Sequence, residues 1–251
     1  MKRKTIILVL LLPVVLCAQT NEELFKQGLE HRKAYKVKEG FDVFSKLMKA
    51  DSSNSEYLAY GSYFYSKTGV VQKTEADQKK YYYKAEYLAK KAIKADDNNA
   101  EAHYAYAMAL GRLNENASSG EKIKNSKQIK KEADRTIALN PKHSGAFHIL
   151  GRWHRTIAGF SGFEKAMVNT FYGGVPPGAT YEDAVKSFMS AVVNEPDFML
   201  HLYELGVTYH EMKKDGYAKP VLEKALTLPT RNEEDLGTKK KVEELLKELK
   251  K

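Results

Sequence analysis

Apolar and polar residues follow a helical rhythm that stops and restarts within residues 137–154. Residues 137–139 end one amphipathic segment, and Asn140 and Pro141 follow it directly. A residue before proline is driven out of the α region, so a helix should end at this point. The next apolar stripe then begins at helical spacing and contains Gly151. This stretch predicts a helix end, a tight turn and a new helix start.

The same order of residues recurs at positions 191–209, with Pro196, Leu202 and Gly206 at the matching places. Large apolar residues beside a small one are typical of two closely packed helices, and repeated helix pairs with a unit of 34 residues are the tetratricopeptide pattern. We therefore expect an all-α fold, a right-handed tetratricopeptide-type superhelix that forms a solenoid.

Alignment on the small residues and the helix ends divides the chain into about five helix pairs within one domain, residues 19–251. The second unit has about eleven residues more between its helices than the 34-residue pattern, and the fourth has an insert at 159–180. An amphipathic segment at 232–251 should form a capping helix over the last apolar face. The units are 21–54, 55–99, 100–143, 144–198 and 199–232.

Residues 1–18 have the organisation of a signal peptide: a basic start, an apolar run of eleven residues and a plausible cleavage point after Ala18. The apolar run is shorter than the roughly 20 residues that a transmembrane helix needs. We expect cleavage and export, to a bacterial periplasm. A retained membrane anchor, including a lipid on Cys17, is the minor alternative.

Charge and cysteine content narrow the function classes. Cleavage would remove three of the 41 basic residues and none of the 32 acidic ones, which leaves a net charge of +6. Solvated Lys-rich helix faces account for this excess, and no nucleic-acid partner is expected. Cys17 is the only cysteine, so the mature chain would have no disulfide and no thiolate site. No catalytic motif is present, His103 and His154 fall at core positions, and we expect neither enzyme activity nor a metal or cofactor.

Positions on the first helix of each pair usually face the concave side of such a solenoid, and basic and aromatic residues occupy many of them here. Guanidinium and ammonium groups beside aromatic rings suit a carboxylate or a phosphate that carries an apolar body. The alternative is that these positions are polar only because they face solvent, without a role in binding. The candidate groove residues are Tyr63, Lys67, Tyr104, Met108, Arg112, His148, Arg152, Arg155, Tyr203 and His210.

The insert contains aromatic and apolar residues at helical spacing, which predicts a short amphipathic helix. Such a helix is most often a lid packed on the solenoid, and less often a membrane-touching or ligand-gating element. The residues that define it are Phe163, Met167, Phe171 and Tyr172.

Four stretches together resemble the regulator of microtubule dynamics family, over roughly residues 85–250. They are EAHYAYAMALG at 101–111, IALNPKHSGAFHILGRWH at 137–154, PPGATYEDAVKSF at 176–188 and EPDFMLHLYELGVTYHEMKK at 195–214. The resemblance implies a helical repeat domain that acts through partners, with links to microtubules, membrane contact sites and phospholipids. A protein exported from a bacterial cytoplasm would meet no microtubules, so this part of the family's function is not expected here.

Two functions remain open at this point. The first is a non-enzymatic tetratricopeptide scaffold that binds a protein or peptide partner in its concave groove. The second is a lipid-binding or lipid-transfer domain, with an apolar cavity under the 160–178 insert and a phospholipid or another anionic amphiphile as ligand. Peripheral contact with a membrane is part of the second hypothesis.

Overall fold

The computed structural model describes residues 19–115, 117, 119–171, 174 and 179–249. This part of the chain forms twelve α-helices and no strand, which confirms the predicted all-α solenoid. None of the helices described has the length and apolar character required to cross a bilayer. The predicted signal peptide at 1–18 and Tyr172 lie outside the described residues.

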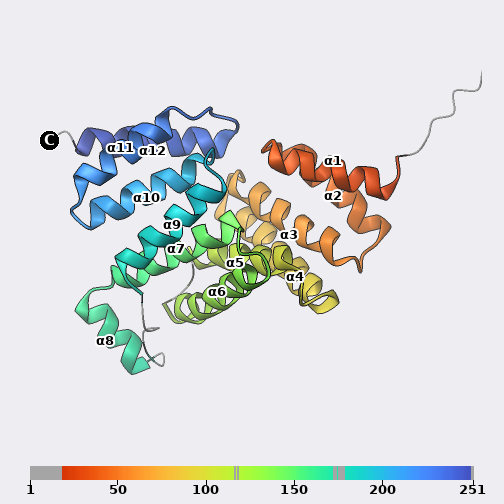
Figure 1. Ribbon diagram of the computed structural model, residues 1–251. Helices are drawn as coiled ribbons and strands as arrows, with labels where there is room; N and C mark the ends of the chain where they lie inside the picture. The colour runs from red at the N-terminus through yellow and green to blue at the C-terminus, as the bar shows by residue number, and fades with distance from the viewer. Residues whose placement is uncertain (1–18, 116, 118, 172–173, 175–178, 250–251) are drawn as a thin grey trace, which may run out of the picture.

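The helices follow one another as antiparallel pairs along a curved path (Figure 1). Each pair packs on the next, and α12 packs on α10 and α11 as the last element. The helices are α1 Asn21–Lys33, α2 Val37–Ala50, α3 Ser55–Val70, α4 Glu75–Ala95, α5 Ala100–Asn114, α6 Ser119–Leu139, α7 Ser144–Ala158, α8 Gly162–Phe171, α9 Tyr181–Asn194, α10 Met199–Glu211, α11 Asp215–Leu226 and α12 Glu233–Glu248.

Side chains at the helix starts explain why the helices begin where they do. The Thr20, Asn54, Asn99 and Asn232 side chains each accept a hydrogen bond from a backbone N–H of the first turn. The helix α6 ends at Leu139, directly before the Asn-Pro pair, as the sequence predicts. The helix starts at 21, 55 and 100 coincide with the predicted unit boundaries, and the predicted stop at Asn140 coincides with a real helix end.

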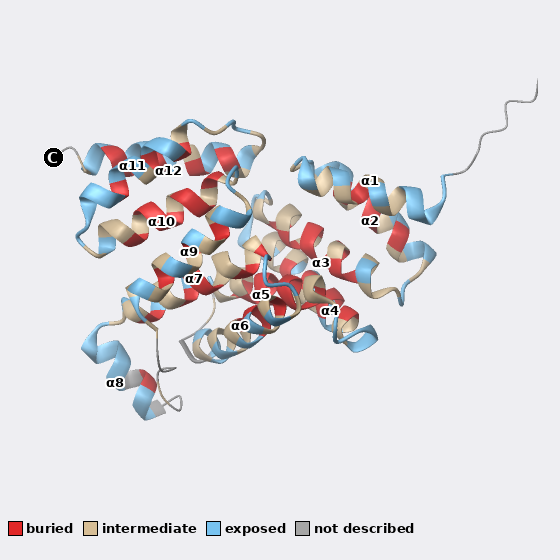
Figure 2. Ribbon diagram, in the orientation of Figure 1, coloured by how far each residue is buried: buried red, intermediate tan, exposed pale blue. Residues whose placement is uncertain are grey.

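Small residues allow the two helices of a pair to approach closely. A Cβ atom built on Gly206 of α10 would lie 2.6 Å from the Leu222 side chain of α11, and one on Gly151 of α7 would lie 2.7 Å from Phe188 of α9. Buried residues follow these contact faces along the whole solenoid (Figure 2). The core is thus a continuous layer between the helices and not a central globule.

The alignment places the extra residues of the second unit between its helices, whereas the structure places them within the helices. They lengthen the helices instead, because α3 runs to Val70 and α4 already begins at Glu75. Thr74 caps α4, and an ion pair between Lys79 and Glu75, four residues apart, supports its first turns. The extra residues of this unit thus form longer helices.

Candidate binding cavity

A cavity of about 580 Å³ lies on the concave side of the solenoid. Its walls come mainly from the first helices α1, α3, α5 and α7 and from the start of α10. Helix α6, the turns before α7 and α10, and the first turn of α12 complete them. The volume falls within the range of about 300–1,000 Å³ that is usual for ligand sites. The curved stacking of helix pairs therefore produces a partly closed chamber.

Seven of the ten predicted groove residues line this cavity: Tyr63, Lys67, Tyr104, Met108, Arg112, His148 and Arg152. They lie on α3, α5 and α7, at the repeat positions from which they were selected. Their binding role stays a prediction, because the structure contains no ligand.

The other three predicted residues lie elsewhere. Arg155 makes an ion pair of 2.6 Å with Glu204 of α10, and His210 contacts Asp215 at the start of α11. Tyr203 packs against the core between α10, α11 and α12. Tyr203 and His210 do not reach the cavity because only the first turn of α10 faces it, while the later turns pack against neighbouring helices. Arg155 lies on α7, and its side chain is directed to Glu204 instead.

Three basic residues of the cavity wall already have carboxylate partners. Arg32 Nη2 lies 2.9 Å from Glu101 Oε1, and the Lys67 and Arg112 side chains both contact Glu234 of α12. Burial alone would raise the pKa of Glu234, but the charges of Lys67 and Arg112 lower it to about 2. The sequence reveals the cations of the groove, whereas it gives no sign of their internal partners.

Two neighbouring histidines, His148 and His201, lie in the cavity wall. His148 Nδ1 lies 2.9 Å from His201 Nδ1, and His201 Nε2 lies 3.5 Å from Glu195 Oε2. Burial lowers the pKa of both histidines, so both rings are neutral. One of the two rings donates its Nδ1 proton to the other, whereas His201 Nε2 is buried without a hydrogen-bond partner among the described residues. The sequence indicates His148 but neither Glu195 nor His201.

The first and last repeats meet at Tyr35, in the turn between α1 and α2. The Tyr35 hydroxyl donates to Glu195 Oε1 at 2.5 Å, and its ring stacks on Phe198 with centroids 5.7 Å apart. The Arg231 guanidinium lies 3.8 Å from the centre of the Tyr35 ring. These contacts close the cavity between the two ends of the solenoid, a closure that no repeat pattern predicts.

The insert does not cover this cavity. Helix α8 projects from the α7–α9 pair, away from the other first helices (Figure 1), and Phe163 on it is 75% exposed. Among the described residues of 159–180, none lines the cavity. The described part of the insert is therefore not a lid over this cavity, and the apolar cavity under residues 160–178 stays a prediction. Tyr172 and the side chains of Met167 and Phe171 lie outside it.

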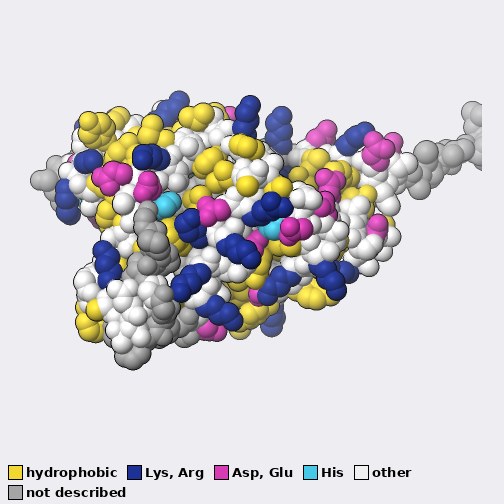
Figure 3. Space-filling model, turned by 60° about the horizontal axis from the view of Figure 1, so that its bottom comes forward, with side chains coloured by type: hydrophobic (Ala, Val, Ile, Leu, Met, Phe, Trp, Pro, Cys, Tyr) yellow, Lys and Arg dark blue, Asp and Glu magenta, His cyan; other side chains and the backbone are white. Residues whose placement is uncertain are grey.

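Figure 3 shows Lys and Arg side chains spread over one face among acidic and apolar ones. The described residues include no group of three or more His, Cys, Asp or Glu that could hold a metal ion. The His103 side chain is enclosed by hydrogen-bond partners from α6 and from the turn before α5.

Known proteins similar to this chain share most of its length. A family model described as "Regulator of microtubule dynamics protein 1-3" matches residues 19–250. Regulator of microtubule dynamics protein 3 of Rattus norvegicus is 30% identical over 234 residues, 92% of this chain and 48% of the relative. Regulator of microtubule dynamics protein 1 of Bos taurus is 31% identical over 176 residues, 69% of this chain and 55% of the relative. The chain spans about half the length of these curated relatives.

A solved structure supports the fold. A thermophilic tetratricopeptide protein of Thermus thermophilus matches 90% of this chain and 99% of its own with a TM-score of 0.61. The two sequences are only 14% identical, so this likeness concerns the architecture alone.

Proposed function

The chain belongs to the regulator of microtubule dynamics family, and we propose that it is a non-enzymatic scaffold that holds a segment of a protein or peptide partner in its central cavity. The observation that carries this proposal is the cavity itself, which is built from the first helices of successive repeats. At about 580 Å³ it has room for a short extended segment and not for a folded domain.

The chemistry of the wall favours a peptide over a lipid chain. Arg32, Glu101, Lys67, Arg112 and Glu234 all line the cavity. An acyl chain beside these groups would displace water without offering polar partners, which is unfavourable. A peptide backbone brings an N–H and a C=O group at nearly every residue, and these groups need such partners when they are buried.

The cavity also offers aromatic surfaces for the side chains of a peptide, in addition to polar groups for its backbone. Tyr63 and Tyr104 line the cavity with ring centroids 6.4 Å apart, and the Arg32 guanidinium lies 4.7 Å from the centre of the Tyr63 ring. Such surfaces bind apolar and amphipathic side chains with little loss of conformational entropy. A partner segment with both apolar and polar side chains would match them.

A cavity-filling variant tests the proposal. Gly111 of α5 lines the cavity, and a Cβ atom added there would meet nothing within 4 Å. Gly111→Trp should fill the cavity without disturbing the fold, and should abolish capture of the partner that co-purifies with the wild-type protein. Gly237→Trp on α12 is the matched control, since its Cβ also meets nothing and the residue lies outside the cavity.

Mass spectrometry of the purified complexes identifies what is captured. A peptide or protein that is lost only from the Gly111→Trp variant supports the proposal. A phospholipid that is lost in the same way would instead establish the lipid-binding alternative, and a partner retained by both variants would contradict binding in the cavity.

The names of the relatives attribute regulation of microtubule dynamics to them. We propose that this chain is exported after cleavage of residues 1–18, and that its partner is therefore not a microtubule. N-terminal sequencing of the mature protein tests this point. An intact Met1 on a cytoplasmic protein would contradict export.

A further inference from the structure

Lys67 and Arg112 together hold the two oxygens of one carboxylate. Lys67 Nζ lies 2.6 Å from Glu234 Oε2, and Arg112 Nη2 lies 3.1 Å from Glu234 Oε1. The two cations come from the adjacent first helices α3 and α5, and all three side chains are at most one-fifth exposed. Lys67 and Arg112 thus form a carboxylate-binding site in the cavity wall, and Glu234 of α12 occupies it.

The occupant comes from an element that otherwise lies outside the cavity. Glu234 is the only α12 residue among the described cavity-lining residues. Helix α12 is anchored away from the cavity, where Val242, Leu245 and Leu246 pack into the core with α10 and α11. Its first turn is also held independently, because the buried Asp235 accepts hydrogen bonds from Arg231. Rotation of the Glu234 side chain alone would therefore vacate the site while α12 stays in place.

A vacated site would need another anion. Two buried cations without a partner are unfavourable, so the vacated site favours an anion over a neutral ligand. Among the described residues, the other carboxylate near them is that of Glu115, 3.5 Å from Arg112 Nη1 and 45% exposed. The open space at Gly111, next to Arg112, gives a ligand room to approach.

We propose that Lys67 and Arg112 bind a carboxylate of the partner peptide, and that Glu234 is an internal competitor which this carboxylate displaces. The inference rests on the proposed function, since it specifies what the partner segment must carry. The carboxylate belongs either to the C-terminus of the partner or to an acidic side chain. In both cases the partner binds only when its carboxylate displaces Glu234. The capping helix therefore lowers the affinity for any partner carboxylate that binds Lys67 and Arg112 weakly.

Three small probes test the site without knowledge of the partner. N-acetylglycine represents a peptide C-terminus, N-acetylglutamate α-amide represents an acidic side chain, and N-acetylglutamine amide is the neutral control. Titrations are followed by the thermal unfolding temperature at constant ionic strength, in the wild-type protein and in the Glu234→Ala variant. Glu233→Ala is the matched control, because this neighbouring glutamate does not line the cavity.

The Glu234→Ala variant should bind at least one of the two carboxylates about tenfold more tightly than the wild type does, because the competitor no longer occupies the site for most of the time. The carboxylate that binds more tightly identifies the source. Lys67→Met added to Glu234→Ala should remove this binding. Equal response to the neutral amide, or no saturable gain over Glu233→Ala, would overturn the inference.

Partner capture separates this inference from the proposed function. If the partner is captured and Gly111→Trp abolishes capture, the proposed function stands. Glu234→Gln should then strengthen capture and Lys67→Met should weaken it. Capture that responds to Gly111→Trp but to neither of these variants would overturn the carboxylate site alone.

Discussion

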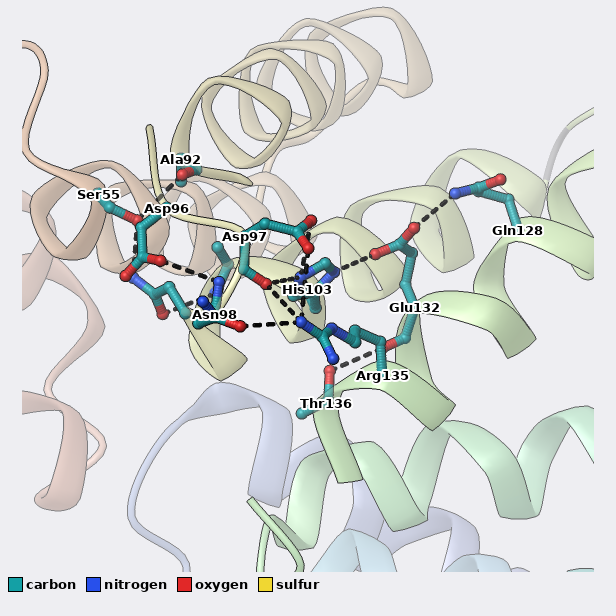
Figure 4. Close-up of polar contacts among 12 residues, drawn as sticks. Ser55, Ala92, Asp96, Asp97, Asn98, His103, Gln128, Glu132, Arg135 and Thr136 are labelled. Carbon is teal, nitrogen blue, oxygen red and sulfur yellow. Dashed lines mark hydrogen bonds and ion pairs between the residues drawn. The ribbon is translucent and has the colours of Figure 1, made fainter. Parts of the chain in front are cut away.

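His103 is a buried residue whose two ring nitrogens both face acceptors (Figure 4). Nδ1 lies 2.5 Å from Glu132 Oε2, and Nε2 lies 2.9 Å from the Asp97 carbonyl oxygen. A ring that donates from both nitrogens is an imidazolium. Burial opposes this charge, but the contacts with Glu132 and Asp97 prevail and raise the pKa of His103 above 6.5. The contacts with Glu132 and Asp97 thus favour the charged form of His103, which ties α5 to α6.

The raised pKa of His103 predicts a pH dependence of stability. Because the folded pKa lies above the unfolded one, the stabilisation is fully present below about pH 6.5 and is lost as pH rises through the folded pKa. Urea unfolding of the wild type and of His103→Gln, at pH 6 and at pH 8.5, measures it. The wild-type advantage over the variant should shrink at the higher pH. An advantage that is independent of pH would contradict a charged His103.

The sequence predicts a cavity-lining residue only where its position in the repeat determines which side of the helix it occupies. Tyr63, Lys67 and Arg112 were found because each repeats a known position on a first helix. Their partner Glu234 could not be found in this way, since it is 167 residues from Lys67 in the chain. Contacts that depend on the curvature of the whole solenoid leave no local pattern in the sequence.

Helix pairs depend on small residues at their crossing points, and the α10–α11 pair gives a direct test. Gly206→Leu places a side chain where Leu222 already lies 2.6 Å from the position of a Cβ atom. Overpacking of this kind costs about 1–3 kcal/mol. The loss should appear as a lower free energy of unfolding in urea.

Gly237 supplies the control for this prediction. It lies within α12, and a Cβ atom there would meet nothing within 4 Å. Gly237→Ala should stabilise the protein by up to about 1 kcal/mol through helix propensity. An equal effect of the two substitutions would count against close packing at Gly206.

Closure of the solenoid depends on side chains and in particular on Tyr35. This residue has a φ of 57°, a conformation that glycine adopts more readily. Tyr35→Gly therefore removes the contacts with Glu195, Phe198 and Arg231 without adding backbone strain.

The Tyr35→Gly variant should keep its helix content but become more extended, because the α1–α2 pair loses its contact with the far end. Small-angle X-ray scattering should show a larger radius of gyration, with an unchanged circular dichroism spectrum. Tyr83→Gly, at a tyrosine 58% exposed on α4, is the comparison for loss of a surface side chain. Equal radii of gyration for the wild type and Tyr35→Gly would show that other contacts hold the two ends of the solenoid together.

Trp153 provides intrinsic fluorescence that reports on the cavity. It is the single tryptophan of the chain, it lines the cavity, and its indole N–H donates to Ser126 Oγ at 2.8 Å. Indole emission changes in wavelength and intensity when the polarity around the ring changes. Entry of a ligand can therefore be followed as a fluorescence change of the unlabelled protein, with no background from a second tryptophan. Candidate partners can be screened in this way before any of them is identified.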